Sequence, residues 1–215
     1  MDSKIFYIDD DAVYFLACLN SECITERNKL LISNSPILEL KGAKNSFVMT
    51  NGYNPRLEDL FKVSEVPFND SNFGENVDMS YLNLYYLDKL IEEGIKLNII
   101  KDRTPLDDAL GFFLATGNKL YFVHDNGVVE RITDNFGVYN SGFSFGAFKA
   151  TEGIENIDDR LLLVHRASIT DGYVQNQFPI LIWDTKTMEP RVYSEEYVLN
   201  LEKRYKEGEP IEWHV

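Results

Sequence analysis

The chain has 215 residues, enough to bury one substantial core, and this length favours a single domain over residues 1–215. It carries 21 Lys and Arg residues against 35 Asp and Glu, and the net charge of −14 repels phosphate backbones, which disfavours nucleic-acid binding. The hydrophobic share of 44%, with 14 Phe and 12 Tyr, is typical of a packed globular protein and not of a disordered one.

Cysteine usage and apolar runs indicate a cytoplasmic protein. Cys18 and Cys23 are too few for a disulfide framework and lack the partner pair of a zinc site. The longest uninterrupted apolar stretch, 12–19, is far shorter than a membrane span, so we expect no membrane contact. Residues 1–4 lack the basic region and apolar core of a signal peptide.

The first half of the chain predicts four strands and two helices. Apolar runs at 5–8 and 12–19 flank three aspartates and predict a hairpin with an acidic turn, because the glycine and alternate ligands of a calcium loop do not follow. Two further strands are predicted at 37–40 and 46–50. The predicted helices span 54–62, opened by a proline, and 79–93, stopped by Gly94; between them the polar loop 64–78 is a candidate mobile insertion.

The second half predicts a run of hairpins followed by helices. Strands are expected at 110–115, 119–124 and 128–132, because Gly-Asn and Asn-Gly turns separate these apolar runs. Helices are expected at 144–151 and 157–169, a buried strand at 180–183, and a C-terminal helix with its tail over 194–215. This order does not suit a parallel doubly wound sheet. It predicts an α+β fold in which two antiparallel sheets pack together with helices outside, an αββα sandwich.

A colinear series of features from 118 to 182 resembles a known family. A hairpin leads to a glycine-flanked turn that holds Ser141. A small-residue helix comes next, and a second helix ends at Asp171 before an edge strand. This order resembles the second half of a proteasome β subunit or of its bacterial relative HslV, which are N-terminal-nucleophile (Ntn) hydrolases. The hairpin within the first 20 residues matches that family loosely. The resemblance implies the proteasome-like Ntn fold, a four-layer αββα sandwich.

The resemblance also implies where the catalytic parts would fall. Family members use the first residue of the mature chain, Thr, Ser or Cys, as nucleophile and its free α-amine as base, and a nearby lysine lowers the pKa of that amine. In this chain Ser3 lies near the register of the nucleophile. Ser141 matches the turn serine and Asp171 the aspartate after the second helix, while Asn20 replaces the aspartate at the end of the second strand.

Two departures from the family pattern argue against catalysis. The lysine should lie near 35–36, where the sequence has Ser and Pro, and the nearest alternatives, Lys29 and Lys41, each need a shifted alignment. Asp2 is too large for ordinary removal of the initiator methionine. Exposing Ser3 would therefore require a cleavage after Asp2.

No other catalytic or metal site is predicted. His124, His165 and His214 are scattered without a ligand spacing, so we interpret them as structural and expect no metal or cofactor. A phosphate-binding loop is absent from the sequence, because no Gly-Lys-Ser or Gly-Lys-Thr follows the glycines at 142 and 146. Asp158 and Asp159 are interpreted as helix-start charges that favour the helix dipole.

These observations lead to three hypotheses. The first is a non-catalytic proteasome/HslV-like subunit that acts as a self-assembling structural or interaction protein. This subunit would be a homo-oligomer, with the helix around 79–91 or the C-terminal helix as contact faces, and a protein partner is also compatible with it. The second is an active Ntn peptidase or amidase matured by cleavage to Ser3. The third is an unrelated α+β binding protein, which would lack two stacked antiparallel sheets.

Overall fold

Two five-stranded antiparallel sheets form the centre of the computed structural model, which describes residues 4–18, 37–50, 55–72, 78–100, 111–124, 128–139, 151–170 and 178–207. Sheet A has the strand order β10-β9-β2-β1-β8 and sheet B the order β3-β4-β5-β6-β7. The strands of sheet A are β1 (Lys4–Ile8), β2 (Val13–Cys18), β8 (Phe136–Tyr139), β9 (Ile180–Asp184) and β10 (Arg191–Tyr193). Those of sheet B are β3 (Ile37–Glu39), β4 (Ser46–Thr50), β5 (Phe112–Thr116), β6 (Lys119–Val123) and β7 (Val129–Ile132).

The inner faces of the two sheets share one aromatic core. Side chains alternate between the faces of a strand, so Phe6 and Phe15 of sheet A point toward sheet B. They meet Phe113, whose ring centroid lies 5.4 Å from that of Phe15, while Phe47 contacts Trp183 at 6.2 Å. Burial of large rings on both inner faces therefore holds the sheets together.

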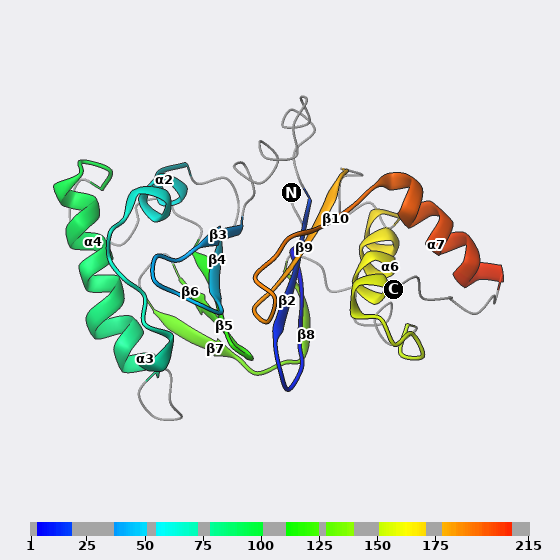
Figure 1. Cartoon of the computed structure of the whole chain (residues 1–215), viewed down its shortest axis with the longest axis horizontal. Coiled ribbons are helices and arrows are strands. Elements are labelled where there is room, and N and C mark those ends of the chain that lie inside the picture. The colour runs from blue at the N-terminus through cyan, green and yellow to red at the C-terminus, as the bar shows by residue number, and fades with distance from the viewer. Residues whose placement is uncertain are drawn as a thin grey trace.

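Helices cover the outer face of each sheet (Figure 1). Over sheet B lie α2 (Pro55–Val63), α3 (Asp78–Tyr81), the π-helical turn η3 (Leu82–Tyr86) and α4 (Leu87–Lys96). Their apolar side chains form one cluster with alternate residues of the strands, such as Phe112 and Leu114 of β5. Over sheet A lie α6 (Ile157–Thr170) and α7 (Glu195–Glu207), which share a second cluster with Ile5, Leu16 and Ile182.

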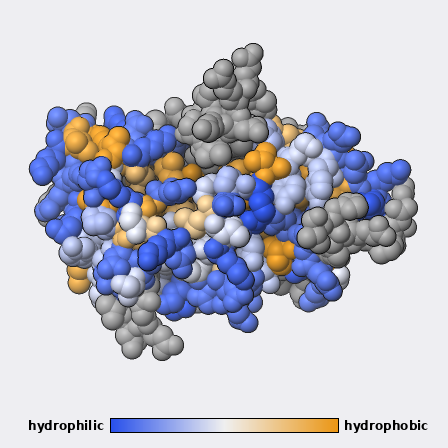
Figure 2. All heavy atoms as spheres, viewed as in Figure 1, coloured by the Kyte–Doolittle hydropathy of each residue, from blue (hydrophilic) through white to orange (hydrophobic). Residues whose placement is uncertain are grey.

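The two antiparallel sheets predicted from the element order are confirmed. Because an unrelated α+β binding protein was expected to lack two facing sheets, the fold does not favour that hypothesis. The outer surface in Figure 2 is largely hydrophilic, with hydrophobic side chains gathered over the ends of α2 and α4. Among the helices of the described residues, none is long and apolar enough to cross a membrane.

Two short strands were missed in the sequence. The glycine-flanked turn that holds Ser141 was expected to begin at Gly137, but residues 136–139 form β8, which pairs with β1 through Phe6 and Gly137. A Cβ on Gly137 would lie 2.3 Å from the Phe6 ring, so glycine is needed for this ring to lie across the neighbouring strand. The other missed strand, β10, is a three-residue edge strand that pairs with β9 and has no fully buried residue.

The helix predicted at 79–93 differs in two ways. It is divided by the π-helical turn η3, and it continues past Gly94 to Lys96. Gly94 is buried, and a Cβ there would lie 2.7 Å from the Ile100 side chain. The glycine therefore permits close packing inside the helix, and the prediction that it ends the helix was wrong.

Part of the loop predicted at 64–78 packs on the core. Phe68 is 1% exposed, and its ring lies 4.9 Å from that of Tyr86. Asp70 accepts hydrogen bonds from the Lys44 amide at 2.6 Å and from the Ser46 hydroxyl at 2.5 Å. The helix predicted at 144–151, apart from its last residue, and the tail 208–215 lie outside the described residues. The single domain over 1–215 and the mobility of 64–78 stay predictions.

Candidate functional site

The strand ends that adjoin the predicted site residues lie at one end of sheet A. Lys4, the first residue of β1, pairs with Tyr139, the last residue of β8. On the other side of β1, Cys18 at the end of β2 pairs with Ile180 at the start of β9. Four strands therefore begin or end at the same edge, called here the open edge.

The predicted site residues themselves, Ser3, Asn20, Ser141 and Asp171, lie outside the described residues. Three of them are close in sequence to the open edge: Ser3 directly precedes β1, Asn20 follows β2 by two positions, and Ser141 follows β8 by two. Asp171 directly follows α6. The structure thus brings the neighbours of Ser3, Asn20 and Ser141 together, while the distances between the site residues stay predictions.

The C-terminal half of α6 approaches the open edge. His165 on this helix lies 6.5 Å, ring centroid to ring centroid, from Phe178, which precedes β9 by two residues. His165 is completely buried, and burial, followed by the nearby Arg166 charge, lowers the pKa of its imidazole to about 4. The ring is therefore neutral at physiological pH, in agreement with a structural role.

The other two histidines and the predicted lack of a metal site are known only as far as the described residues show them. His124 lies beside β7, and its Nε2 atom is 3.2 Å from the Glu130 carboxylate. His214 falls outside the described residues. Within the described ranges, no group of three or more His, Cys, Asp and Glu side chains is placed to hold a metal ion.

Lys41 lies at the opposite end of the sheets from the open edge. Four turns meet at that end: the Asn118 side chain donates to the Asp10 carbonyl at 3.0 Å, the Gly117 amide donates to the Asn45 carbonyl at 3.0 Å, and the Thr185 hydroxyl donates to the Gly117 carbonyl. These contacts define the closed edge of the two sheets.

Lys41 belongs to the turn before β4 at the closed edge, and it forms an ion pair with Glu65. The length of a five-residue strand, ~16 Å, separates the two edges. Lys41 therefore cannot reach an amine beside Lys4. Lys29, the other alternative, lies outside the described residues.

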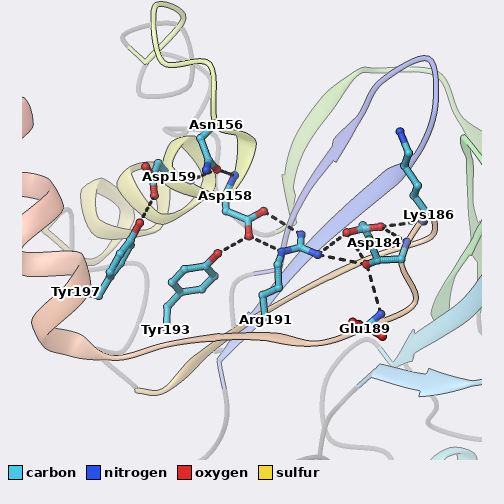
Figure 3. Close-up of polar contacts among 10 residues, drawn as sticks. Asn156, Asp158, Asp159, Asp184, Lys186, Glu189, Arg191, Tyr193 and Tyr197 are labelled. Atoms are coloured by element: carbon cyan, nitrogen blue, oxygen red, sulfur yellow. Dashed lines mark hydrogen bonds and ion pairs between the residues drawn. The ribbon is translucent and has the colours of Figure 1, made fainter. Parts of the chain in front are cut away.

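A partly buried ionic network joins the start of α6 to β10 (Figure 3). The Arg191 guanidinium donates to both carboxylate oxygens of Asp158, at 2.6 and 2.9 Å, and also to Asp184. Tyr193 donates its hydroxyl to Asp158 at 2.5 Å, and Tyr197 donates to Asp159 at 2.8 Å. Arg191 thus holds two carboxylates from different elements in one cluster, called here the Arg191 network.

The Arg191 network changes the interpretation of Asp158 and Asp159. Both lie in the first turn of α6, as predicted, but they are buried, and their carboxylates bond to side chains of β10 and α7. The Asn156 side chain caps the helix by accepting from the amides of both aspartates, at 2.8 and 3.2 Å. The aspartates therefore bond α6 to β10 and α7. The predicted role at the helix dipole does not include these contacts.

Burial and close partners shift the pKa values of the network. Burial alone would lower the pKa of Arg191, but the hydrogen bonds and charges of Asp158 and Asp184 outweigh it and raise this pKa. Burial likewise works to raise the pKa of Asp184, yet the Thr187 amide and Arg191 hold it below its ordinary value. Burial, followed by Asp158, raises the pKa of the Tyr193 hydroxyl. Asp184 and Arg191 are therefore charged and paired at neutral pH, while the Tyr193 hydroxyl keeps its proton, as expected of a structural contact.

The fold belongs to the class of proteasome-type β-subunit folds, as comparison with known proteins indicates. No protein-family model and no curated protein matches the chain in sequence. Solved structures match it over nearly its whole length.

Anbu, the ancestral beta-subunit, from Yersinia bercovieri is 11% identical, with a TM-score of 0.56 over 96% of this chain and 93% of that chain. A Gly-1 mutant of Anbu from Hyphomicrobium sp. strain MC1 is 11% identical, with a TM-score of 0.57 over 100% of both chains. BPH from Thiobacillus denitrificans, in complex with epoxomicin, is 13% identical, with a TM-score of 0.54 over 85% of this chain and 97% of that chain. At this level of identity the likeness concerns the fold, and it confirms the proteasome-like fold that the resemblance implied.

Proposed function

We propose that this chain is a proteasome/HslV-like subunit with the four-layer αββα sandwich of the Ntn hydrolases. We further propose that it acts as a non-catalytic, self-assembling structural or interaction protein. The layer arrangement is supported by the three separate apolar clusters, one between the sheets and one under each helical layer. The kinship is supported by the likeness to Anbu, which extends over 96–100% of this chain.

The non-catalytic part of the proposal is supported by the sequence at 35–36, where the resemblance places the lysine and this chain has Ser and Pro. An N-terminal nucleophile needs a base whose pKa is near neutral, and the resemblance assigns the lowering of that pKa to a lysine. Lys41, one of the two alternatives nearest in sequence, is paired with Glu65 at the closed edge. Asn20 further replaces an aspartate by a neutral amide, which removes the charge that would orient a lysine.

A covalent inhibitor tests this part directly. The purified chain is incubated with peptide substrates and with epoxomicin, the compound bound in the BPH structure, and intact mass is measured. BPH serves as the positive control, and a Ser3→Ala variant as the matched control for specific labelling. We expect neither turnover nor an adduct. Turnover or an adduct that disappears in Ser3→Ala would refute the non-catalytic proposal.

The alternative, an active peptidase or amidase that begins at Ser3, is favoured by one observation. Pairing of Lys4 with Tyr139 brings the neighbours of Ser3 and Ser141 onto adjacent strands. Cleavage after Asp2 would expose the Ser3 amine at this position. Intact-mass spectrometry of the protein from cells discriminates the two, because a mature Ser3 chain lacks Met1 and Asp2, whereas a chain that retains them rules this route out.

A further inference from the structure

The helical rod formed by η3 and α4 has an inner and an outer side. Leu82, Tyr86, Leu90 and other buried residues of the inner side pack on sheet B. On the outer side Leu84 is 79% exposed, and among the described elements none lies beyond α4 in this layer (Figure 1).

A stripe of alternating charge runs along this outer side. Lys89, Glu92 and Lys96 are exposed, and their spacing of three and four residues places them on one line along the helix. Tyr85, which is 49% exposed, continues this line one turn before Lys89. We call these four residues the α4 stripe. A groove of about 400 Å³ runs beside the stripe, and it is lined by Glu65, Val66, Lys89, Glu92, Glu93 and Lys96.

The charges of the α4 stripe are complementary to those of a second copy of the stripe that runs antiparallel to it. If two copies of the helix pack antiparallel about a two-fold axis between positions 90 and 91, Lys89 of each copy faces Glu92 of the other. The same axis places Tyr85 opposite Lys96 of the second copy, a cation–π arrangement. We propose that a second copy of this chain docks antiparallel on the α4 stripe. This inference rests on the proposed self-assembly and names the surface through which it occurs.

The aromatic part of the stripe is already ordered for contact. The Tyr85 ring stacks on Tyr81 with centroids 5.6 Å apart and an interplanar angle of 24°, and the Lys89 ammonium lies 5.3 Å from the Tyr85 centroid. A side chain held in this way loses little conformational entropy on binding. Glu92 makes a contact within its own chain, but charged contacts at an exposed position are weak and exchange readily.

The net charge of the chain and the alternating charges of the stripe both favour a second copy of this chain as the partner. Two chains of net charge −14 repel each other, so random faces do not associate. A face on which both signs alternate can meet its own copy with opposite charges opposed, and the α4 stripe is such a face. A contact made by a single helix is at the small end of protein interfaces, so association is expected to depend on concentration.

Charge-reversal variants, measured alone, mixed and combined in one chain, test the proposal by sedimentation velocity over a range of concentrations. By symmetry Lys89→Glu and Glu92→Lys each oppose like charges twice, so each is expected to raise the dissociation constant about tenfold. An equimolar mixture of the two variants restores association, because the two acidic side chains of one variant then face the two basic side chains of the other. The double variant also restores it. Lys44→Glu and Glu152→Lys, which reverse exposed charges on other elements, serve as matched controls without effect.

The outcomes separate this inference from the proposed function. An oligomer that persists unchanged in Lys89→Glu and Glu92→Lys overturns the α4 contact and leaves self-assembly intact. Loss of association in the single variants without recovery in the mixture also overturns it. A wild-type chain that stays monomeric at the highest concentration overturns both proposals. Circular dichroism of each variant shows that the fold is kept.

Discussion

Arg191→Met is expected to destabilise the protein strongly at neutral pH and much less in acid. The substitution keeps an unbranched apolar stem but removes the guanidinium, which bonds Asp158 and Asp184. Those two side chains are only 9% and 4% exposed, so they would be left buried without their cation. Removal of one partner from a buried ion pair costs about 3–5 kcal/mol. Because Arg191 itself is 30% exposed and water can replace part of its interaction, we expect about 2–3 kcal/mol.

The pH dependence follows from the pKa of Asp184. In the folded wild-type protein this pKa lies below its ordinary value, with Arg191 among the causes. The ionised carboxylate therefore stabilises the fold above the unfolded pKa of about 3.8, and this stabilisation is lost as the pH falls through the folded pKa. Without Arg191, fewer partners oppose the effect of burial, so the pKa of Asp184 is expected to rise. The destabilisation should therefore be full at pH 6–8 and shrink toward pH 3.

Urea unfolding at pH 7 and at pH 3.5 measures the effect, with the buried Trp183 next to Asp184 as fluorescence probe. Lys206→Met is the matched control, since it removes a cation whose side chain is 70% exposed, and it should cost below about 1 kcal/mol. Adding Asp158→Asn and Asp184→Asn to the Arg191→Met variant should recover part of the stability. A loss no larger than that of Lys206→Met, or one independent of pH, would refute the reasoning.

Three further substitutions test the core and the closed edge. The pKa of His165 is about 4 in the folded protein and 6.5 ordinarily, so on acidification the unfolded chain binds the proton first. Up to about 3 kcal/mol of folding stability should therefore be lost as the pH falls from 6.5 to 4. His165→Gln should flatten this part of the stability curve, and an unchanged slope would contradict the assignment. Gly137→Val should cost about 1–3 kcal/mol in urea unfolding, because its Cβ would lie 2.3 Å from the Phe6 ring, whereas Gly153→Ala, with open space around its Cβ, should be near neutral. Thr185→Val should cost about 1–3 kcal/mol by leaving two backbone groups of the closed edge without their hydroxyl partner, while Thr185→Ser should retain most of the stability.

Local patterns in the sequence were sufficient for most elements. The hairpin of β5 and β6 follows from apolar runs on either side of Gly117, and α6 was predicted at 157–169 against an observed 157–170. The start of α7 follows from Ser194, whose hydroxyl accepts from the Tyr197 amide at 3.2 Å. Each of these features is decided by residues within a few positions of one another. The alternation of strands and helices then limited the fold to two antiparallel sheets.

The candidate site was predictable only in outline. Ser3, Asn20, Ser141 and Asp171 came from a resemblance in element order, and they lie outside the described residues. The open edge beside three of them arises from the pairing of Lys4 with residue 139 far along the chain. The Arg191 network likewise joins Asp158 to Arg191, which lies 33 positions later, and no local sequence pattern links the two residues.

By itself, the sequence determined most of the strands and helices, that the strands form antiparallel sheets, and that the chain is strongly acidic. Periodicity and turn chemistry act over short distances, so they can be recognised without knowing the fold. Only the tertiary structure decided that Lys41 belongs to the closed edge, that Gly94 lies inside a helix, and that Asp158 meets Arg191. Those contacts depend on which faces are buried together, and that choice is made by the packing of the whole chain.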